Sequence, residues 1–159
     1  MIRIAKTWFG LDDKLSTCIT ADGIEYLREK LNEKTSYDVI VFDVNNDDSQ
    51  SPIRCPHPSF LSQQVLLNVK SLLSTNAGLF ILNFASRDDN NQQRTDCLKN
   101  LGDVFQCLST VKVDDDINEI IFASENQLNH LKSSGKISQE NLSFNFDITE
   151  LLSKVKIEK

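Results

Sequence analysis

Two aspartates stand where a carboxylate could act on an amine. Asp22 follows the apolar segment 15–20, and Asp43 lies near the end of the apolar segment 37–44. If both segments are parallel strands, both carboxylates lie at the carboxyl edge of a sheet, where ligands bind in doubly wound folds. A carboxylate at the first position can accept a hydrogen bond from an exocyclic amine. A carboxylate at the second can orient or deprotonate an amine nucleophile, so the pair predicts a ligand site.

Each aspartate also has a purely structural interpretation. Asp22 could cap a helix that begins near Gly23, and Asp43 could accept hydrogen bonds from backbone donors of the following loop. For either residue alone, the two interpretations are about equally supported. The pair favours a site, because each aspartate follows an apolar strand at the expected ligand-binding edge.

The elements that must position these aspartates alternate between apolar strands and amphipathic helices. The segment 37–44 (YDVIVFDV) is nearly continuous in β-branched residues, which predicts a strand covered on both faces. A polar loop over 45–58 follows it, and Ser59 is expected to cap the next helix, which ends near Ala77-Gly78. The other predicted elements are strands over 15–20, 79–85, 104–113 and 119–124, and helices over 23–33, up to about Leu101, and around 148–155.

This order predicts an α/β fold, βαβαβα followed by a hairpin. Strands that alternate with helices form parallel βαβ units, the basis of doubly wound sheets. The last two predicted strands are joined by the short acidic turn Asp114-Asp115-Asp116. So short a connection requires an antiparallel hairpin, because a parallel crossover needs a dozen residues or more.

Composition limits the class of protein. A chain of 159 residues with 40% hydrophobic and 25% charged residues is typical of one soluble domain. The net charge of −6 argues against a general affinity for nucleic acid or for an anionic membrane, since both need a basic face. The sequence shows no secretory signal and no apolar run of the roughly 20 residues that span a bilayer. A reducing, cytoplasmic setting is therefore expected.

The cysteines and histidines do not predict a metal site. The four cysteines form no CxxC pair and only two histidines are present, so a structural zinc site is not expected. Cys18 and Cys107 lie in apolar strand-like runs and are expected to be buried, reduced thiols. Trp8-Phe9 is expected to pack in a core or interface, with an adenine pocket as the less favoured alternative. His57 is expected to be a solvated loop residue rather than a proton shuttle.

Several segments together resemble spermidine-synthase-like methyltransferase domains, most closely the C-terminal domain of the enzymes that methylate lysine and the N-terminus of elongation factor 1-alpha. The resemblance covers nearly the whole chain. It is carried by TADGIEY at 20–26 and YDVIVFD at 37–43, and by AKTWFG at 5–10, CPHPSF at 55–60, FILNF at 80–84, RD at 87–88, NEIIF at 118–122 and LLSKVKI at 151–157.

The resemblance implies a fold, a cofactor and roles for the residues. It implies a Rossmann-like class I methyltransferase sheet that ends in the antiparallel β-hairpin, with S-adenosyl-L-methionine as cofactor and no metal. Asp22 would contact the adenine amine, and Gly23 would allow close backbone approach. Asp43 would face the reactive centre as the catalytic residue and also contact the cofactor. Val44 would line the cofactor pocket, and Asn45 would line the substrate pocket.

The sequence departs from that family at its front. Such domains begin with a strand, a glycine-rich turn and a helix, and their second strand ends in an acidic residue. Neither feature occurs, and no GxGxxG-like sequence is present. We therefore expect residues 1–159 to be a partial, N-terminally truncated domain: a fragment, a partial gene model or a degenerate copy.

Three functions remain open at the level of sequence. The first is amine methylation of a protein substrate such as elongation factor 1-alpha. The second is a non-catalytic methyltransferase remnant or binding module, motivated by the missing glycine turn. The third is aminopropyl transfer, as in the polyamine synthases, which rests on fold-level similarity. A homo-oligomer is compatible with each of them.

Overall fold

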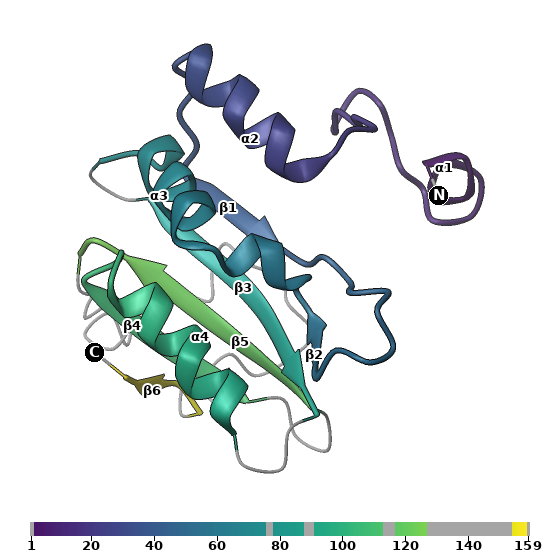
Figure 1. Cartoon of the computed structure of the whole chain (residues 1–159). Helices are drawn as coiled ribbons and strands as arrows, with labels where there is room; N and C mark the ends of the chain where they lie inside the picture. The colour runs from purple at the N-terminus through teal and green to yellow at the C-terminus, as the bar shows by residue number, and fades with distance from the viewer. Residues whose placement is uncertain (1, 76–77, 88–90, 113–116, 127–153, 159) are drawn as a thin grey trace.

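The computed structural model describes residues 2–75, 78–87, 91–112, 117–126 and 154–158 as a mixed α/β unit (Figure 1). Its helices are α1 (Ile2–Trp8), α2 (Gly23–Asn32), the 3-10 helix η1 (Pro58–Leu61), α3 (Gln63–Leu72) and α4 (Gln92–Gly102). Its strands are β1 (Val39–Phe42), β2 (Ile53–Cys55), β3 (Leu79–Ser86), β4 (Cys107–Lys112), β5 (Asn118–Ser124) and β6 (Lys156–Ile157).

The strands form one mixed sheet in the order β1-β3-β5-β4-β6. β1 and β3 are parallel, as expected for strands joined through a helix. β5 runs antiparallel to both of its neighbours, β3 and β4. The predicted α/β class and the predicted antiparallel pairing of the last two long strands are therefore confirmed. The acidic turn 114–116 lies outside the described residues.

The core lies between one face of this sheet and the helices. Alternate residues of β3, Phe80, Leu82 and Phe84, are buried, and α3 and α4 lie over that same face (Figure 1). The Phe80 ring makes an edge contact with Phe42 at a centroid distance of 4.9 Å and stacks with Phe105 at 5.8 Å. Such ring pairs stabilise a core beyond their area burial, so the aromatic cluster ties β1 and β3 to the segment after α4.

The predicted strand over 15–20 is wrong. The segment has no regular structure, and the side chains of Leu15 and Ile19 are 86% and 54% exposed. A strand needs a neighbour to satisfy its backbone hydrogen bonds, and among the described residues none pairs with this segment. Trp8 and Phe9 are also exposed, at 77% and 81%, so they do not pack in the core of this chain.

β1 is not covered on both faces, contrary to the prediction for 37–44. Val39 and Val41 are 48% and 59% exposed, whereas Phe42 is buried. β1 lies at the end of the described sheet order, so it has a strand neighbour on one side only. The continuous apolar run correctly predicted a strand, but half of its side chains face away from the helices.

Several predicted boundaries differ from the observed ones. The segment 45–58 is not only loop, because β2 pairs antiparallel with the end of β3. Ser62 rather than Ser59 precedes α3, which ends at Leu72 rather than near Gly78. The strand predicted over 104–113 begins at Cys107.

The predicted C-terminal helix over 148–155 lies mostly outside the described residues. Val155 is not helical and leads directly into β6, which pairs with β4 through only two residues. No helix in the described part of the chain is long and apolar enough to cross a membrane.

Candidate functional site

Asp43 lies at the carboxyl end of β1, beside the parallel strand β3. Because Phe42 is in register with Leu82, the residues that follow, Asp43 and Asn83, are neighbours. The Asn83 Nδ2 donates to Asp43 Oδ1 over 2.9 Å. A carboxylate only accepts hydrogen bonds, so the amide nitrogen must face Asp43 and the Asn83 Oδ1 must point elsewhere. That oxygen is buried and has no hydrogen-bond partner among the described residues.

Cys55 of β2 is a second contact of Asp43. Its Sγ lies 3.8 Å from Asp43 Oδ1, a distance suited to an S–H donor. Burial and the neighbouring Asp43 charge raise the pKa of the Cys55 thiol to about 11. The thiol is therefore neutral near pH 7 and donates to the carboxylate instead of competing with it as an anion.

Asp22 is the N-cap of α2. Its Oδ1 accepts from the backbone nitrogens of Ile24 and Glu25 at 2.9 and 3.0 Å, so Asp22 caps α2. The side chain is exposed. Capping does not exhaust its acceptors, because a carboxylate offers about four lone-pair positions. The cap therefore leaves acceptor capacity for the predicted ligand contact.

Gly23 allows η1 to approach the start of α2. A Cβ at Gly23 would lie 3.1 Å from Phe60 Cζ, closer than ordinary van der Waals contact. The Phe60 ring in turn packs edge-on against Phe42, with centroids 5.2 Å apart. This chain of contacts connects the start of α2 to the carboxyl end of β1. The structure thus brings the segments of both predicted site aspartates to one region of the fold.

The other predicted site residues lie in the loop after β1. Val44 is half-buried and its carbonyl accepts from the His57 backbone nitrogen at 3.1 Å, whereas Asn45 is exposed. The next residue, Asn46, is buried and orders this loop, because its Nδ2 donates to the Ile53 carbonyl at 2.8 Å. His57 is exposed, as predicted, and accepts from the Ser59 backbone nitrogen at the start of η1.

Sequence reasoning missed the roles of Asn83 and Cys55. Both residues lie in segments that carry the family resemblance, but the amide and thiol contacts to Asp43 depend on strand pairing. A polar Asn within the apolar run FILNF was the available signal, because buried polar groups need partners. Among the residues that the structure describes, no group of three or more His, Cys, Asp or Glu side chains is placed to hold a metal ion.

The predicted burial of two thiols outside this site is wrong. Cys18 is exposed and Cys107 is half-buried, whereas Cys55 and Cys97 are buried. Burial raises the pKa of the Cys97 thiol to about 12. Cys18 lost its expected cover because segment 15–20 does not join the sheet.

The reactivity of the thiols should follow their exposure. At mildly alkaline pH, the exposed Cys18 is expected to react rapidly with a disulfide reagent. Cys55 and Cys97 should react much more slowly, because the thiolate is the nucleophile and burial raises the pKa of both thiols. Stopped-flow absorbance of the released thiol, with peptide mapping by mass spectrometry, measures this order. Cys18→Ser should remove the fast phase. Labelling of Cys55 as fast as Cys18 would contradict the structure.

No family model matches the chain. The chain is similar to eEF1A lysine and N-terminal methyltransferases of several animals. It is 36% identical to the human protein over 77% of the chain and 18% of that protein, and 31% identical to the Danio rerio protein over 99% of the chain and 25% of that protein. The homologue from Drosophila melanogaster is 34% identical over 80% of the chain and 19% of its own length. The chain therefore spans a quarter or less of these relatives.

The fold is also similar to a solved structure, human methyltransferase-like protein 13 in complex with SAH. The TM-score is 0.77 and the sequence identity 29%, over 96% of this chain and 72% of that chain. The mixed sheet with its antiparallel end is thus a methyltransferase-like arrangement.

Proposed function

We propose that this chain, which is homologous to the eEF1A lysine and N-terminal methyltransferases, is part of an S-adenosylmethionine-dependent protein methyltransferase domain. The observation that carries the proposal is the structural similarity to an SAH-bound methyltransferase, at 29% identity over 96% of the chain. SAH is the product that remains when S-adenosylmethionine gives up its methyl group. The relatives are eEF1A lysine and N-terminal methyltransferases, which supports an amine of elongation factor 1-alpha as acceptor.

The residues at the carboxyl ends of β1 and β3 fit an amine-transfer site. S-adenosylmethionine supplies an electrophilic methyl group when bound. In this proposal Asp43, held by Asn83, accepts a hydrogen bond from the acceptor amine and directs its lone pair. Val44 and Asn45 then line the cofactor and substrate sides of the loop.

Asp22 and Gly23 would hold the adenine end of the cofactor. The Asp22 carboxylate already accepts two backbone N–H groups, and it keeps acceptor capacity for an exocyclic amine. Gly23 is exposed at the start of α2, and its missing side chain leaves room for the Phe60 ring beside it.

The same proposal includes four further points. The domain is spermidine-synthase-like, works in the cytoplasm, can form a homo-oligomer, and has no nucleic-acid or membrane partner. The net charge of −6 supports the last point. A non-catalytic binding module is the second candidate, because no glycine-rich GxGxxG turn occurs in the sequence.

Titration of the chain with SAH by isothermal titration calorimetry tests the proposal. We expect saturable binding that is about 10-fold weaker or more in Asp22→Asn, because the neutral amide is a poorer acceptor for the adenine amine. Asn is as good a helix cap as Asp, so this variant separates ligand contact from capping. Asp96→Asn, an exposed aspartate of α4, is the matched control and should bind SAH normally.

Two further results decide between the candidates. Equal SAH affinity of Asp22→Asn and the native chain would leave Asp22 as a cap only. A chain that binds no SAH and transfers no methyl group to elongation factor 1-alpha would contradict the proposal and favour the binding module.

A further inference from the structure

A cavity of about 500 Å³ opens at the carboxyl edge of β3 and β4, next to the start of α4. Asp43 and Asn83 do not line it. Its walls come from the end of β3, the start of β5, the end of β4, the short strand β6 and the first turn of α4. Phe84 supplies an apolar wall and Ile117, 45% exposed, lies at its border. The cavity therefore combines strand ends that are far apart in the sequence.

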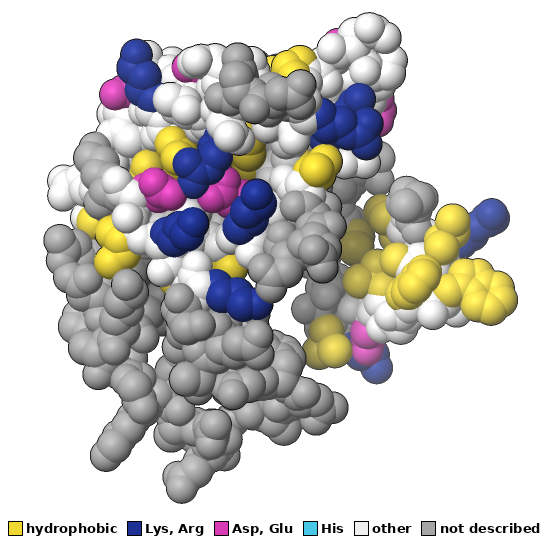
Figure 2. Space-filling view, turned by 90° about the horizontal axis from the view of Figure 1, so that it is seen from below, with side chains coloured by type: hydrophobic (Ala, Val, Ile, Leu, Met, Phe, Trp, Pro, Cys, Tyr) yellow, Lys and Arg dark blue, Asp and Glu magenta, His cyan; other side chains and the backbone are white. Residues whose placement is uncertain are grey.

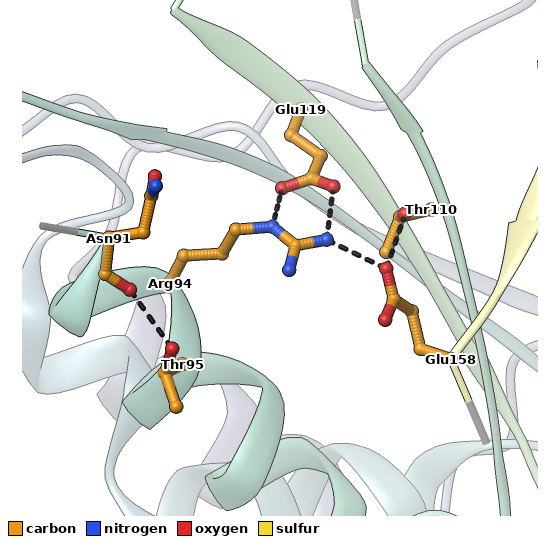
Figure 3. Close-up of polar contacts among 6 residues, drawn as sticks. All are labelled: Asn91, Arg94, Thr95, Thr110, Glu119 and Glu158. Carbon is orange, nitrogen blue, oxygen red and sulfur yellow. Dashed lines mark hydrogen bonds and ion pairs between the residues drawn. The ribbon is translucent and has the colours of Figure 1, made fainter.

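Arg94 bridges the two carboxylates of this cavity. Its Nε and Nη2 donate to the two oxygens of Glu119 at 2.7 and 2.8 Å, and Nη2 also donates to Glu158 at 2.7 Å (Figure 3). Thr110 Oγ1 donates to the same Glu158 oxygen at 3.1 Å. The hydrogen bond from Arg94 lowers the pKa of Glu158, with smaller contributions from Thr110 and Lys156, so one guanidinium contacts both acids and favours the Glu158 anion.

Lys112 and Lys156 add two further positive charges to the lining of the cavity. Lys112 is in register with Glu119 and Lys156 with Thr110, so both lysines emerge from the sheet beside the cavity. Neither ammonium group forms an ion pair with any described residue. Figure 2 shows Lys and Arg side chains gathered around acidic ones on this face. Among the residues that the structure describes, three cationic and two acidic side chains line the cavity, so its described lining has an excess of positive charge in a chain of charge −6.

We propose that this cavity binds an acidic peptide segment of the methyl-acceptor protein, with carboxylates paired to Lys112 and Lys156. The proposal rests on the proposed function for the identity of the ligand as acceptor protein. The cavity opens at the same carboxyl edge of the sheet as Asp43, because Ser86 and Lys112 end the parallel strands β3 and β4. A segment bound there would hold the acceptor on the side of the sheet where Asp43 lies.

Charge and size together favour a peptide with carboxylates. A basic ligand would face two lysines and would have to compete with Arg94 for the two acids. A lone inorganic anion would fill little of about 500 Å³ and would leave the wall at Phe84 uncovered. A peptide can place carboxylates on the lysines and apolar atoms on Phe84.

The test uses the full chain without cofactor and two capped peptides, Ac-Ala-Glu-Glu-Ala-NH₂ and its Gln-Gln counterpart. Binding is measured by NMR titration of the ¹⁵N-labelled chain. We expect the Glu peptide to shift amides of α4 and β4, to bind about 10-fold more tightly than the Gln peptide, and to weaken as salt is added. The variant Lys112→Gln/Lys156→Gln should lose this preference.

The matched control is Lys14→Gln/Lys99→Gln, which removes two exposed lysines outside the cavity and should bind both peptides as the native chain does. Equal affinity for the two peptides, or equal loss in both double variants, would overturn the proposal. So would binding that appears only after Asp114, Asp115 and Asp116 are changed to Asn, since the chain's own acids would then occupy the cavity. Because no methyl transfer is measured, failure here is distinct from failure to bind SAH.

Discussion

Replacing Arg94 with methionine is expected to lower the free energy of unfolding by about 3–5 kcal/mol. The Glu119 side chain is only 11% exposed, and Arg94 satisfies both of its carboxylate oxygens. Methionine fills a similar volume but leaves Glu119 as a buried charge without its partner. Urea denaturation at neutral pH, followed by far-UV circular dichroism, measures the loss.

Two comparison variants isolate the effect. Lys99→Met changes an exposed residue of the same helix and should alter the free energy of unfolding by no more than about 0.5 kcal/mol. Arg94→Met/Glu119→Leu also removes the unpaired Glu119 carboxylate. It should recover most of the lost free energy of unfolding, because a buried ion pair can be replaced by apolar residues. A loss below about 1 kcal/mol in Arg94→Met would show that the pair is solvated and adds little.

The same network makes the free energy of unfolding depend on pH. Arg94 holds the pKa of Glu158 below its ordinary value, so the folded state favours the anion. The stability from Glu158 is therefore fully present above the ordinary carboxyl pKa of about 4.3 and is lost as the pH falls through the lower folded value. Arg94→Met should remove this part of the acid dependence.

Elements with strong periodicity were predictable from sequence. α2 presents Ile24, Leu27 and Leu31 on one face and begins at Gly23 as predicted. The runs that became β3 and β5 are long and apolar enough to predict strands. These features depend on local pattern, which the sequence carries directly.

Features that depend on distant partners were not predictable. β2 has three residues inside a polar segment and exists because it pairs with the end of β3. Segment 15–20 has strand-like residues but no pairing partner among the described ones. At the cavity, Arg94 meets Glu119 and Glu158 across 25 and 64 positions of the chain, a separation that no periodicity reveals.

Replacing Asp43 with asparagine is expected to reduce methyl transfer to elongation factor 1-alpha by about 10²–10⁴-fold, the usual contribution of a positioned base. The amide keeps the shape of the carboxylate and can still accept from Asn83, so the fold should change little. Transfer of labelled methyl groups measures the rate. Asp47→Asn, an exposed aspartate of the same loop, is the matched control and should stay within about twofold.

The substitution has a second result that does not depend on activity. The Asp43 charge and its contact with the thiol both raise the pKa of Cys55, although burial is the larger cause. Asp43→Asn should therefore lower that pKa and speed modification of Cys55, while Cys97, whose pKa is raised mainly by burial, is unchanged. Faster Cys55 labelling with unaltered methyl transfer would confirm the geometry and reject the catalytic role. Unaltered labelling would show that the carboxylate does not face Cys55, and the proposed orientation of Asp43 would then be wrong.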